Sequence, residues 1–330
     1  MTNIVALGAG RMGRGIAQVF AYAGHDVTVL DFKPREAADS EKLLAAGKQE
    51  VAQNLAFLVE LNVLDASEVE AILGRIHGAG ADKAAEVLGQ ADYVFEGVPE
   101  VMAAKEDALI RAGKLTRPEC IIASTTSTMS VNALSDFVDG PERFLNAHWL
   151  NPAYLIPLVE VSPGDRTSED VVTRLMDFLK SVGKVPVRCK ASPGYIVPRI
   201  QSVAMNEAAR MVEEGVATAE DIDLAVRVGF GLRYATMGLV EFTDWGGVDI
   251  LYYACNYLQK ELQSDRFAPA EIVKQKMESG ELGLGHGKGF YDYSEVDPDK
   301  FRSDKLSTFV ALLRHMDMLP MLGGKSQGDR

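Results

Sequence analysis

Residues 3–31, NIVALGAGRMGRGIAQVFAYAGHDVTVLD, contain the pattern that decides the fold. A short apolar run at residues 4–7 predicts a buried strand, and the amphipathic residues 13–23 predict a helix. A second apolar run, residues 27–30, predicts the next strand and ends at Asp31. Strand, glycine-rich turn, helix and strand in this order predict a βαβ unit that binds a dinucleotide.

The turn between the first strand and the helix carries three glycines at the spacing of a dinucleotide fingerprint. Gly8 permits a tight turn, Gly10 lets the backbone approach a pyrophosphate, and Gly13 allows close packing of the helix. Met12 belongs to the same turn, and we expect it to contact the cofactor as well. The free amides at the start of the helix are suited to binding phosphate.

The residue that ends the second strand indicates which cofactor is bound. Asp31 can accept hydrogen bonds from the adenine ribose hydroxyls, which favours NAD over NADP. Two cations, Lys33 and Arg35, follow closely and would suit the 2′-phosphate of NADP, although Asp31 would repel it. The sequence therefore predicts NAD and leaves NADP as the alternative.

The rest of the chain predicts an α/β domain followed by an all-α domain. Residues 3–190 alternate short apolar runs with longer amphipathic ones, as in a Rossmann-type doubly wound parallel sheet, and residues 36–74 insert a helical hairpin. We expect an NAD-binding domain at 1–190, a helical substrate and dimerisation domain at 191–320, and a flexible tail at 321–330. The candidate helices of the second domain are residues 202–214, 219–228, 239–262 and 268–279.

Composition excludes several classes of protein. With 47% apolar and 25% charged residues the chain is an ordinary globular protein, and its net charge of −13 disfavours nucleic acid and anionic membranes as partners. The three cysteines are far apart and match no metal-ligand spacing, which predicts free thiols and no metal site. No basic leader or long apolar run is present, so we expect a cytoplasmic protein with a small-molecule substrate.

Polar residues that end or interrupt apolar strands are the candidates for catalysis. Residues 120–124 predict a strand that runs into Thr125–Thr128, and residues 143–149 predict the next strand, which contains His148. Glu160 lies inside a third apolar run, LVEV, where a buried carboxylate needs a partner. We predict that Glu160 orients His148, whose other ring nitrogen accepts a proton from a substrate hydroxyl.

At these motifs the chain resembles the L-3-hydroxyacyl-CoA dehydrogenase family over nearly its whole length. GAGRMGRGIA, ASTTSTMS, His148-Trp-Leu-Asn-Pro152 and LVEV match family blocks, and MGLVEFTDWGGVD and GKGFYDY have counterparts. The resemblance implies that His148 is the general base, Glu160 its partner, Ser127 the hydroxyl that holds the substrate oxygen, and Asn151 a residue that shapes the site. It also implies that Glu100 and Lys105 approach the nicotinamide end of the cofactor.

Three features depart from the acyl-CoA members of that family. Pro198 replaces the asparagine of the motif GF(I/V)xNR, here Gly194-Tyr-Ile-Val-Pro-Arg199, and the segment 229–238 is longer and contains Arg233. The hairpin, lysine-rich in many acyl-CoA members, has two lysines against eight acidic residues and is a poor anion site. These features resemble the branch that acts on small free acids, such as carnitine, L-gulonate or a pyridine carboxylate. Arg233 would suit a free carboxylate or a surface salt bridge equally.

We therefore predict NAD-dependent oxidation of a short 3-hydroxyacyl-CoA, such as 3-hydroxybutyryl-CoA, in fatty acid metabolism. A dehydrogenase of a small free hydroxy acid is the first alternative, and a non-catalytic NAD-binding protein is the second. Dense apolar and aromatic residues in 239–258 predict that the chain forms a homodimer through its C-terminal domain.

Overall fold

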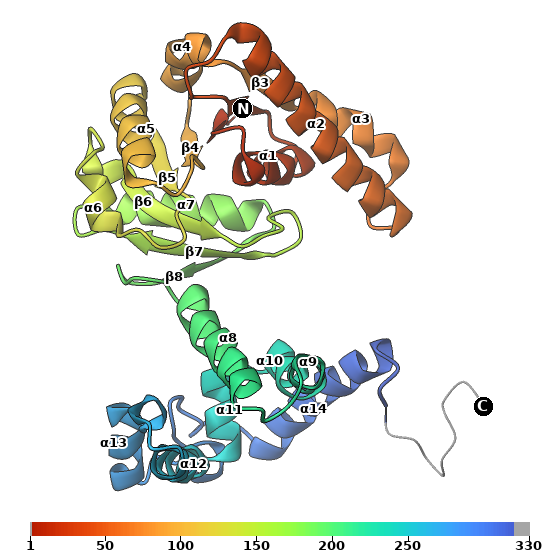
Figure 1. The fold of residues 1–330 in the computed structure, drawn as a ribbon, viewed down its shortest axis with the longest axis vertical. Helices are drawn as coiled ribbons and strands as arrows, with labels where there is room; N and C mark the ends of the chain where they lie inside the picture. Colours follow the sequence, from red (N-terminus) through yellow and green to blue (C-terminus); the bar gives the residue numbers. More distant parts are fainter. Residues whose placement is uncertain (1, 320–330) are drawn as a thin grey trace. The chain divides into compact units, whose positions relative to one another are not determined.

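The computed structural model describes residues 2–319, which divide into two compact units, residues 1–206 and 207–330 (Figure 1). The expected tail at 321–330 lies outside the described residues. Among the described residues, no helix combines the length and apolar composition that crossing a membrane requires.

The first unit is built on one eight-stranded sheet in the order β3-β2-β1-β4-β5-β6-β7-β8. Neighbouring strands are parallel except β6 and β7, which are antiparallel. The strands are β1 (Ile4–Leu7), β2 (Val27–Leu30), β3 (Ile76–Ala79), β4 (Tyr93–Glu96), β5 (Ile121–Ser124), β6 (Phe144–Trp149), β7 (Leu158–Pro163) and β8 (Val185–Arg188). The structure confirms the predicted Rossmann-type fold.

Helices cover both faces of this sheet (Figure 1). The alternation along β1 explains this packing: Ile4 and Ala6 join one apolar core, and Val5 and Leu7 join the other. The helices α1 (Arg11–Tyr22), α2 (Ala37–Glu60), α3 (Val69–Gly74) and α7 (Glu169–Ser181) contribute to the first core. The helices α4 (Ala84–Gly89), α5 (Met102–Leu115) and α6 (Val131–Ser135) contribute to the second.

The antiparallel step between β6 and β7 departs from the predicted parallel sheet. Only residues 150–157 join the two strands, and a parallel crossover needs a dozen residues or more. Strand β7 therefore turns back beside β6 and pairs His148 with Glu160 in register. The short distance in sequence between the two apolar runs is therefore a signal for antiparallel pairing.

The predicted helical hairpin is confirmed. It consists of α2, a short 3-10 helix at Ala66–Glu68, and α3, which ends at Gly74. Asp65 caps the second half, because its carboxylate accepts a hydrogen bond from the amide of Ser67 at 2.8 Å. The helix α8 (Val197–Glu213) follows the sheet and continues past the end of the first unit.

The second unit is helical, as predicted, but its helix boundaries differ. The predicted helix at 239–262 is two helices, α11 (Leu239–Gly246) and α12 (Val248–Glu261), because Gly247 has a φ of +107° that a helix does not allow. The remaining helices are α9 (Ala219–Ala225), a π-helix at Val226–Gly231, α10 (Leu232–Thr236), α13 (Glu271–Ser279) and α14 (Pro298–His315). The last of these was not among the candidate helices.

One buried carboxylate joins the two C-terminal sequence motifs. Asp244 of α11 is 1% exposed and accepts hydrogen bonds from the amides of Phe290 and Tyr291, each at 2.9 Å. The motifs MGLVEFTDWGGVD and GKGFYDY therefore stabilise one another within the second unit. This contact gives both motifs a structural role.

Candidate active site

A cavity of about 520 Å³ lies at the carboxyl ends of the parallel strands, where ligands bind in open α/β sheets. Gly8, Gly10, Met12, Asp31 and Glu100 line it, and so do Lys33, Arg35, Thr125 and Ser127. Most residues predicted to bind the cofactor therefore lie around one cavity. The exceptions are Gly13 and Lys105, which do not line this cavity.

Two glycines of the turn have different surroundings. Gly13 packs against the backbone of Gly8, and Gly10 borders open space that a phosphate could enter. A Cβ on Gly13 would lie 1.9 Å from the carbonyl oxygen of Gly8, so only glycine lets α1 begin this close to β1. A Cβ on Gly10 would meet nothing within 4 Å, so its backbone is accessible at the N-terminus of α1. The turn therefore fits the pyrophosphate of a dinucleotide.

The carboxylate of Asp31 is buried at the end of β2 and is fixed by two donors. Nε of Arg35 and the hydroxyl of Ser40 each donate to Oδ2 of Asp31 at 2.9 Å. The other oxygen, Oδ1, is thereby oriented for a ribose hydroxyl. Arg35 pairs with Asp31, and Lys33 lines the same cavity. Both cations therefore line the cavity together with Asp31, where we expect the adenine ribose.

Lys105 belongs to a buried ion pair rather than to the cavity surface. Its Nζ lies 3.0 and 3.1 Å from the two carboxylate oxygens of Glu96 and 3.4 Å from Oε2 of Glu100. Glu96 is 0% exposed and also accepts hydrogen bonds from the amide of Val98 at 2.8 Å and the hydroxyl of Ser124 at 2.5 Å. Sequence analysis missed Glu96, although it ends an apolar strand as Asp31 does.

Glu100 connects this buried pair to the cavity. Its Oε1 accepts hydrogen bonds from the hydroxyl of Thr126 and from the amide of Ser127, the latter at 3.0 Å. Burial by itself raises the pKa of Glu100, but the Thr126 hydrogen bond and the charge of Lys105 outweigh burial and lower it. Glu100 therefore stays ionised and holds the loop that follows β5.

His148 and Glu160 form a buried pair on facing strands. Nδ1 of His148 lies 2.8 Å from Oε2 of Glu160, and the other oxygen, Oε1, accepts the amides of Ile196 and Val197, each at 2.8 Å. Glu160 is 0% exposed, so these three contacts satisfy a carboxylate that would be costly to bury alone. The pairing agrees with the geometry expected of a base and the residue that orients it.

The structure locates the other two predicted catalytic residues on loops. Ser127 is exposed and lines the cofactor cavity. Asn151 is exposed in the connection between β6 and β7 and precedes a cis proline, Pro152. His148 is the penultimate residue of β6, and Ser127 follows β5, so the three residues come from two neighbouring strand ends.

Pro198 occupies a position where proline is tolerated. The helix α8 begins at Val197, so Pro198 lies in its first turn, where a missing amide hydrogen breaks no helical bond. The amides that bind Glu160 belong to the two preceding residues. The substitution therefore removes the family's asparagine side chain and leaves the contact with Glu160 intact.

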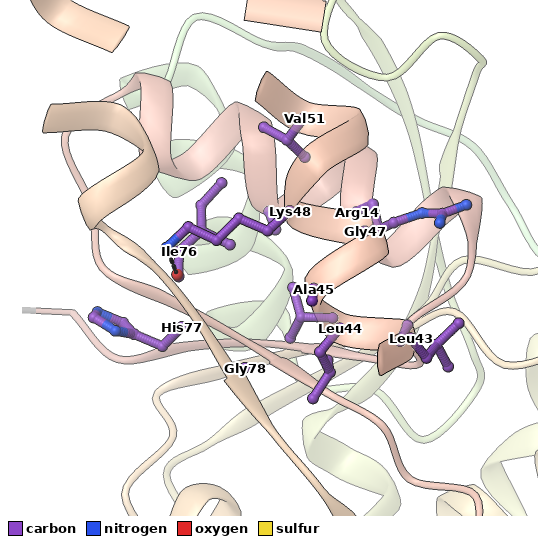
Figure 2. A pocket seen from close by; sticks show the side chains of 13 residues that line it. Arg14, Leu43, Leu44, Ala45, Gly47, Lys48, Val51, Ile76, His77 and Gly78 are labelled. Carbon is purple, nitrogen blue, oxygen red and sulfur yellow. Dashed lines mark hydrogen bonds between the residues drawn. The ribbon is translucent and has the colours of Figure 1, made fainter. Parts of the chain in front are cut away.

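A second, smaller cavity of about 180 Å³ lies under α2 and contains none of the predicted site residues (Figure 2). Its lining is mostly apolar, and Nε of Arg14 is buried there without a hydrogen-bond partner. Lys48 donates to the carbonyl of Ile76 at 3.1 Å, the dashed line in Figure 2, and Arg14 pairs with Glu50 at 3.1 Å. Ala9 and Leu43 line both this cavity and the cofactor cavity.

Taken together, the doubly wound sheet, the glycine turn and Asp31 define a dinucleotide-dependent oxidoreductase with a Rossmann-type domain. Within the described part of the chain, no cluster of three His, Cys, Asp or Glu side chains is arranged to hold a metal ion.

Comparisons with known proteins identify the family. The family described as "3-hydroxyacyl-CoA dehydrogenase, NAD binding domain" matches residues 3–192, and its C-terminal domain matches residues 194–293. A probable 3-hydroxybutyryl-CoA dehydrogenase from Deinococcus radiodurans is 34% identical over 87% of this chain and 98% of its own length. A solved 3-hydroxyacyl-CoA dehydrogenase from Archaeoglobus fulgidus is 31% identical, with a TM-score of 0.77, over 97% of this chain and 100% of its own.

Another relative has a different kind of substrate. A 5-formyl-3-hydroxy-2-methylpyridine 4-carboxylate 5-dehydrogenase from Mesorhizobium japonicum is 29% identical over 96% of this chain and 98% of its own length. The chain belongs to the L-3-hydroxyacyl-CoA dehydrogenase family, which confirms the resemblance found in the sequence. It is an NAD-dependent oxidoreductase that acts on CH–OH groups.

Proposed function

We propose that the chain oxidises the 3-hydroxyl of a short 3-hydroxyacyl-CoA, of the 3-hydroxybutyryl-CoA type, to the 3-oxo compound. The buried His148–Glu160 pair carries this proposal, because it supplies an oriented base at the strand ends that border the cofactor cavity. The similarity to 3-hydroxybutyryl-CoA dehydrogenases over 87% of the chain supports the acyl-CoA substrate.

In the proposed mechanism His148 takes the proton of the substrate hydroxyl. Glu160 accepts from Nδ1 of the ring, which makes Nε2 the nitrogen that receives the proton. Glu160 then stabilises the imidazolium, Ser127 holds the substrate oxygen, and Asn151 shapes the same pocket. NAD held by the glycine turn and Asp31 would supply the hydride-transfer chemistry of this oxidation. A base placed in this way accelerates reaction by about 10² to 10⁴.

A small free hydroxy acid is the second candidate substrate, and the charge of the hairpin favours it. The hairpin carries two lysines, and Lys48 is engaged with the carbonyl of Ile76. Its eight acidic residues would repel the phosphates of coenzyme A. They are Glu36, Asp39, Glu41, Glu50, Glu60, Asp65, Glu68 and Glu70.

Two further observations support the free acid. The pyridine-carboxylate dehydrogenase matches 316 residues of this chain, against 288 for the D. radiodurans relative. Arg233, for which we propose a free carboxylate as ligand, has its Nε on the carbonyl of Gly229 at 3.0 Å and its guanidinium 5.1 Å from the ring centre of Phe242. A guanidinium held in this way is suited to bidentate binding of a carboxylate.

Absorbance at 340 nm would test these candidates directly. The purified chain is mixed with NAD⁺ and L-3-hydroxybutyryl-CoA, free 3-hydroxybutyrate, carnitine or L-gulonate. Turnover of the thioester alone supports the acyl-CoA proposal, and turnover of a free acid alone supports the second candidate. Silence with every substrate, while NADH still binds, supports the non-catalytic alternative.

We also propose that the chain forms a cytoplasmic homodimer through the helical region 191–320 and takes part in fatty acid metabolism. Three apolar side chains along α12 support the dimer, because Ile250, Tyr253 and Tyr257 are 61%, 63% and 65% exposed. Sedimentation velocity at micromolar concentration is expected to give a dimer for the wild type and a monomer for Tyr257→Glu. A wild type that sediments only as monomer would contradict the proposal.

A further inference from the structure

Tyr195 lies in a left-handed turn that a large side chain rarely adopts. Its φ is +46°, and the preceding Gly194 has a φ of +76°. A bulky residue stays in this conformation only where its surroundings fix it. The turn directs the next two amides, of Ile196 and Val197, to Oε1 of Glu160. The conformation of Tyr195 is thus coupled to the carboxylate that orients His148.

The ring of Tyr195 stacks on the imidazole of His148. The two ring centres are 5.1 Å apart and the planes differ by 6°. Tyr195 is buried, so its ring covers one face of the imidazole and excludes water from it. With Glu160 bound at Nδ1, the stacked ring leaves His148 little freedom to rotate.

The hydroxyl of Tyr195 joins two loops of the site. It donates to the carbonyl of Thr126 at 2.8 Å and accepts from Nδ2 of Asn146 at 3.0 Å. Asn146 precedes His148 by two residues on β6, so both side chains point to the same face of the sheet. Burial raises the pKa of Tyr195, which keeps the hydroxyl protonated and able to donate.

Thr126 extends this connection to the cofactor cavity. Its own hydroxyl binds Oε1 of Glu100, which also accepts the amide of Ser127. Glu100 and Ser127 line the cavity. A continuous set of contacts therefore runs from the cavity wall through Glu100, Thr126 and Tyr195 to His148.

We propose that Tyr195 is a positioning residue for the reaction: its ring fixes the imidazole of His148, and its hydroxyl fixes the loop that carries Ser127. The inference rests on the roles proposed above for His148 and Ser127. To those two roles the inference adds Tyr195 as the residue that connects His148 to the loop carrying Ser127.

Two substitutions of Tyr195 test the roles of its hydroxyl and its ring separately. Tyr195→Phe keeps the stacked ring and removes the hydroxyl, which leaves the carbonyl of Thr126 and the amide of Asn146 without this partner. We expect kcat to fall about tenfold, because the loop that carries Ser127 and the strand that carries His148 each lose one buried hydrogen bond. Tyr195→Leu removes the stack as well, and kcat should fall further. Tyr93→Phe is the matched control, because Tyr93 stacks on Phe178 in the same unit, at the opposite ends of the strands.

A double-mutant cycle distinguishes positioning from a general structural effect. If the Tyr195 hydroxyl acts through Ser127, Tyr195→Phe should cost less than about twofold in a Ser127→Ala background. A tenfold loss in both backgrounds would overturn the inference. Thermal denaturation of each variant shows whether it is folded under the assay conditions.

Nitrogen NMR of ¹⁵N-histidine-labelled protein gives a readout that does not depend on turnover. The wild type and Tyr195→Phe should hold His148 in the tautomer with the proton on Nδ1, and Tyr195→Leu should give a mixture of tautomers. His148→Gln identifies the signal. If no substrate is oxidised but the signal responds in this way, the proposed function fails and the positioning role stands. An unchanged signal in folded Tyr195→Leu overturns the positioning role.

Discussion

Nδ1 of His148 lies 2.8 Å from Oε2 of Glu160 because β7 turns back antiparallel to β6 and pairs the two residues in register. The pair is buried, and the amides of Ile196 and Val197 occupy the second carboxylate oxygen. Glu160 can therefore orient the ring through Nδ1, which leaves Nε2 outside this contact.

The first prediction follows from this arrangement. His148→Gln removes the base, and we expect kcat to fall by at least about 10², the usual scale for general-base catalysis. The affinity for NADH should stay within about twofold, because His148 does not line the cofactor cavity. Steady-state kinetics and fluorescence titration with NADH measure the two quantities. Full activity in the variant would exclude His148 as the base.

Glu160→Gln tests the partner in the same pair. The side-chain oxygen of the variant can still accept the two backbone amides, but the amide nitrogen that replaces Oε2 donates to Nδ1. The ring then carries its proton on Nε2, which can no longer act as the base, and it has lost its negatively charged partner. We expect kcat to fall by about 10² or more. His77→Gln is the control, since His77 also contacts a carboxylate, Asp26, at 3.1 Å, but both side chains are exposed. An undiminished kcat in Glu160→Gln would argue against the dyad.

A second prediction concerns the choice between NAD and NADP. Arg35 and Ser40 donate to Oδ2 of Asp31, so removing the carboxylate charge frees a guanidinium beside the ribose position. In Asp31→Asn we expect kcat/KM for NAD to fall about tenfold or more and kcat/KM for NADP to rise, because Arg35 and Lys33 can then meet a 2′-phosphate. Asp170→Asn is the matched control, because Asp170 forms an exposed pair with Arg174 four residues away on α7. Undiminished preference for NAD in Asp31→Asn would refute this account.

The sequence predicted the elements whose signals are local. The glycine turn, Asp31 and the hairpin follow from residues adjacent in the chain, and the shared family motifs pointed to His148 and Glu160. Glu96, the last residue of β4, was missed although Asp31 directly follows β2 in the same way, because its partner Lys105 is on the following helix. A charged residue at the end of any buried strand would have been the signal to follow.

Other features depend on a single backbone conformation or on tertiary contacts, neither of which the hydrophobic periodicity reports. Gly247 divides a continuous apolar pattern into α11 and α12 through its backbone conformation alone. Tyr195 looks like an ordinary turn residue in sequence, and its place against His148 arises only when β6 and the turn before α8 come together. Asp244, likewise, acts on amides 46 and 47 residues away.

A third prediction addresses the buried pair behind the cavity. Lys105→Met leaves the carboxylate of Glu96 buried without its counter-charge, and losing one partner of such a pair costs about 3 to 5 kcal/mol. We expect the free energy of unfolding in urea to fall by that order. Lys114→Met, on the exposed side of the same helix, should change it by less than about 0.5 kcal/mol. A double variant, Glu96→Gln with Lys105→Met, should recover part of the loss, and equal stability of Lys105→Met and wild type would refute the argument.

The last prediction is a pH dependence of stability that comes from Lys184. Its Nζ is buried under the connection between β6 and β7 and donates to the carbonyls of Ala153 and Ile156, at 2.5 and 2.9 Å. Burial lowers the pKa of Lys184 to about 8 from an ordinary value of 10.5. Between these values the unfolded chain binds the proton and the folded chain does not, so this group makes the folded state more stable as pH rises.

Comparison with Lys184→Met isolates this contribution. The unfolding free energy of the wild type minus that of the variant should rise between pH 8 and pH 10.5, by at most about 3.5 kcal/mol, since one pKa unit corresponds to ~1.4 kcal/mol. Urea unfolding at several pH values measures the difference, and groups common to both proteins cancel. Lys180→Met, an exposed position on α7, should give a difference that does not vary with pH. If the stability difference for Lys184→Met also does not vary with pH, the buried amine keeps its proton in the folded state. The two carbonyls would then compensate the cost of burying its charge, and this prediction would be wrong.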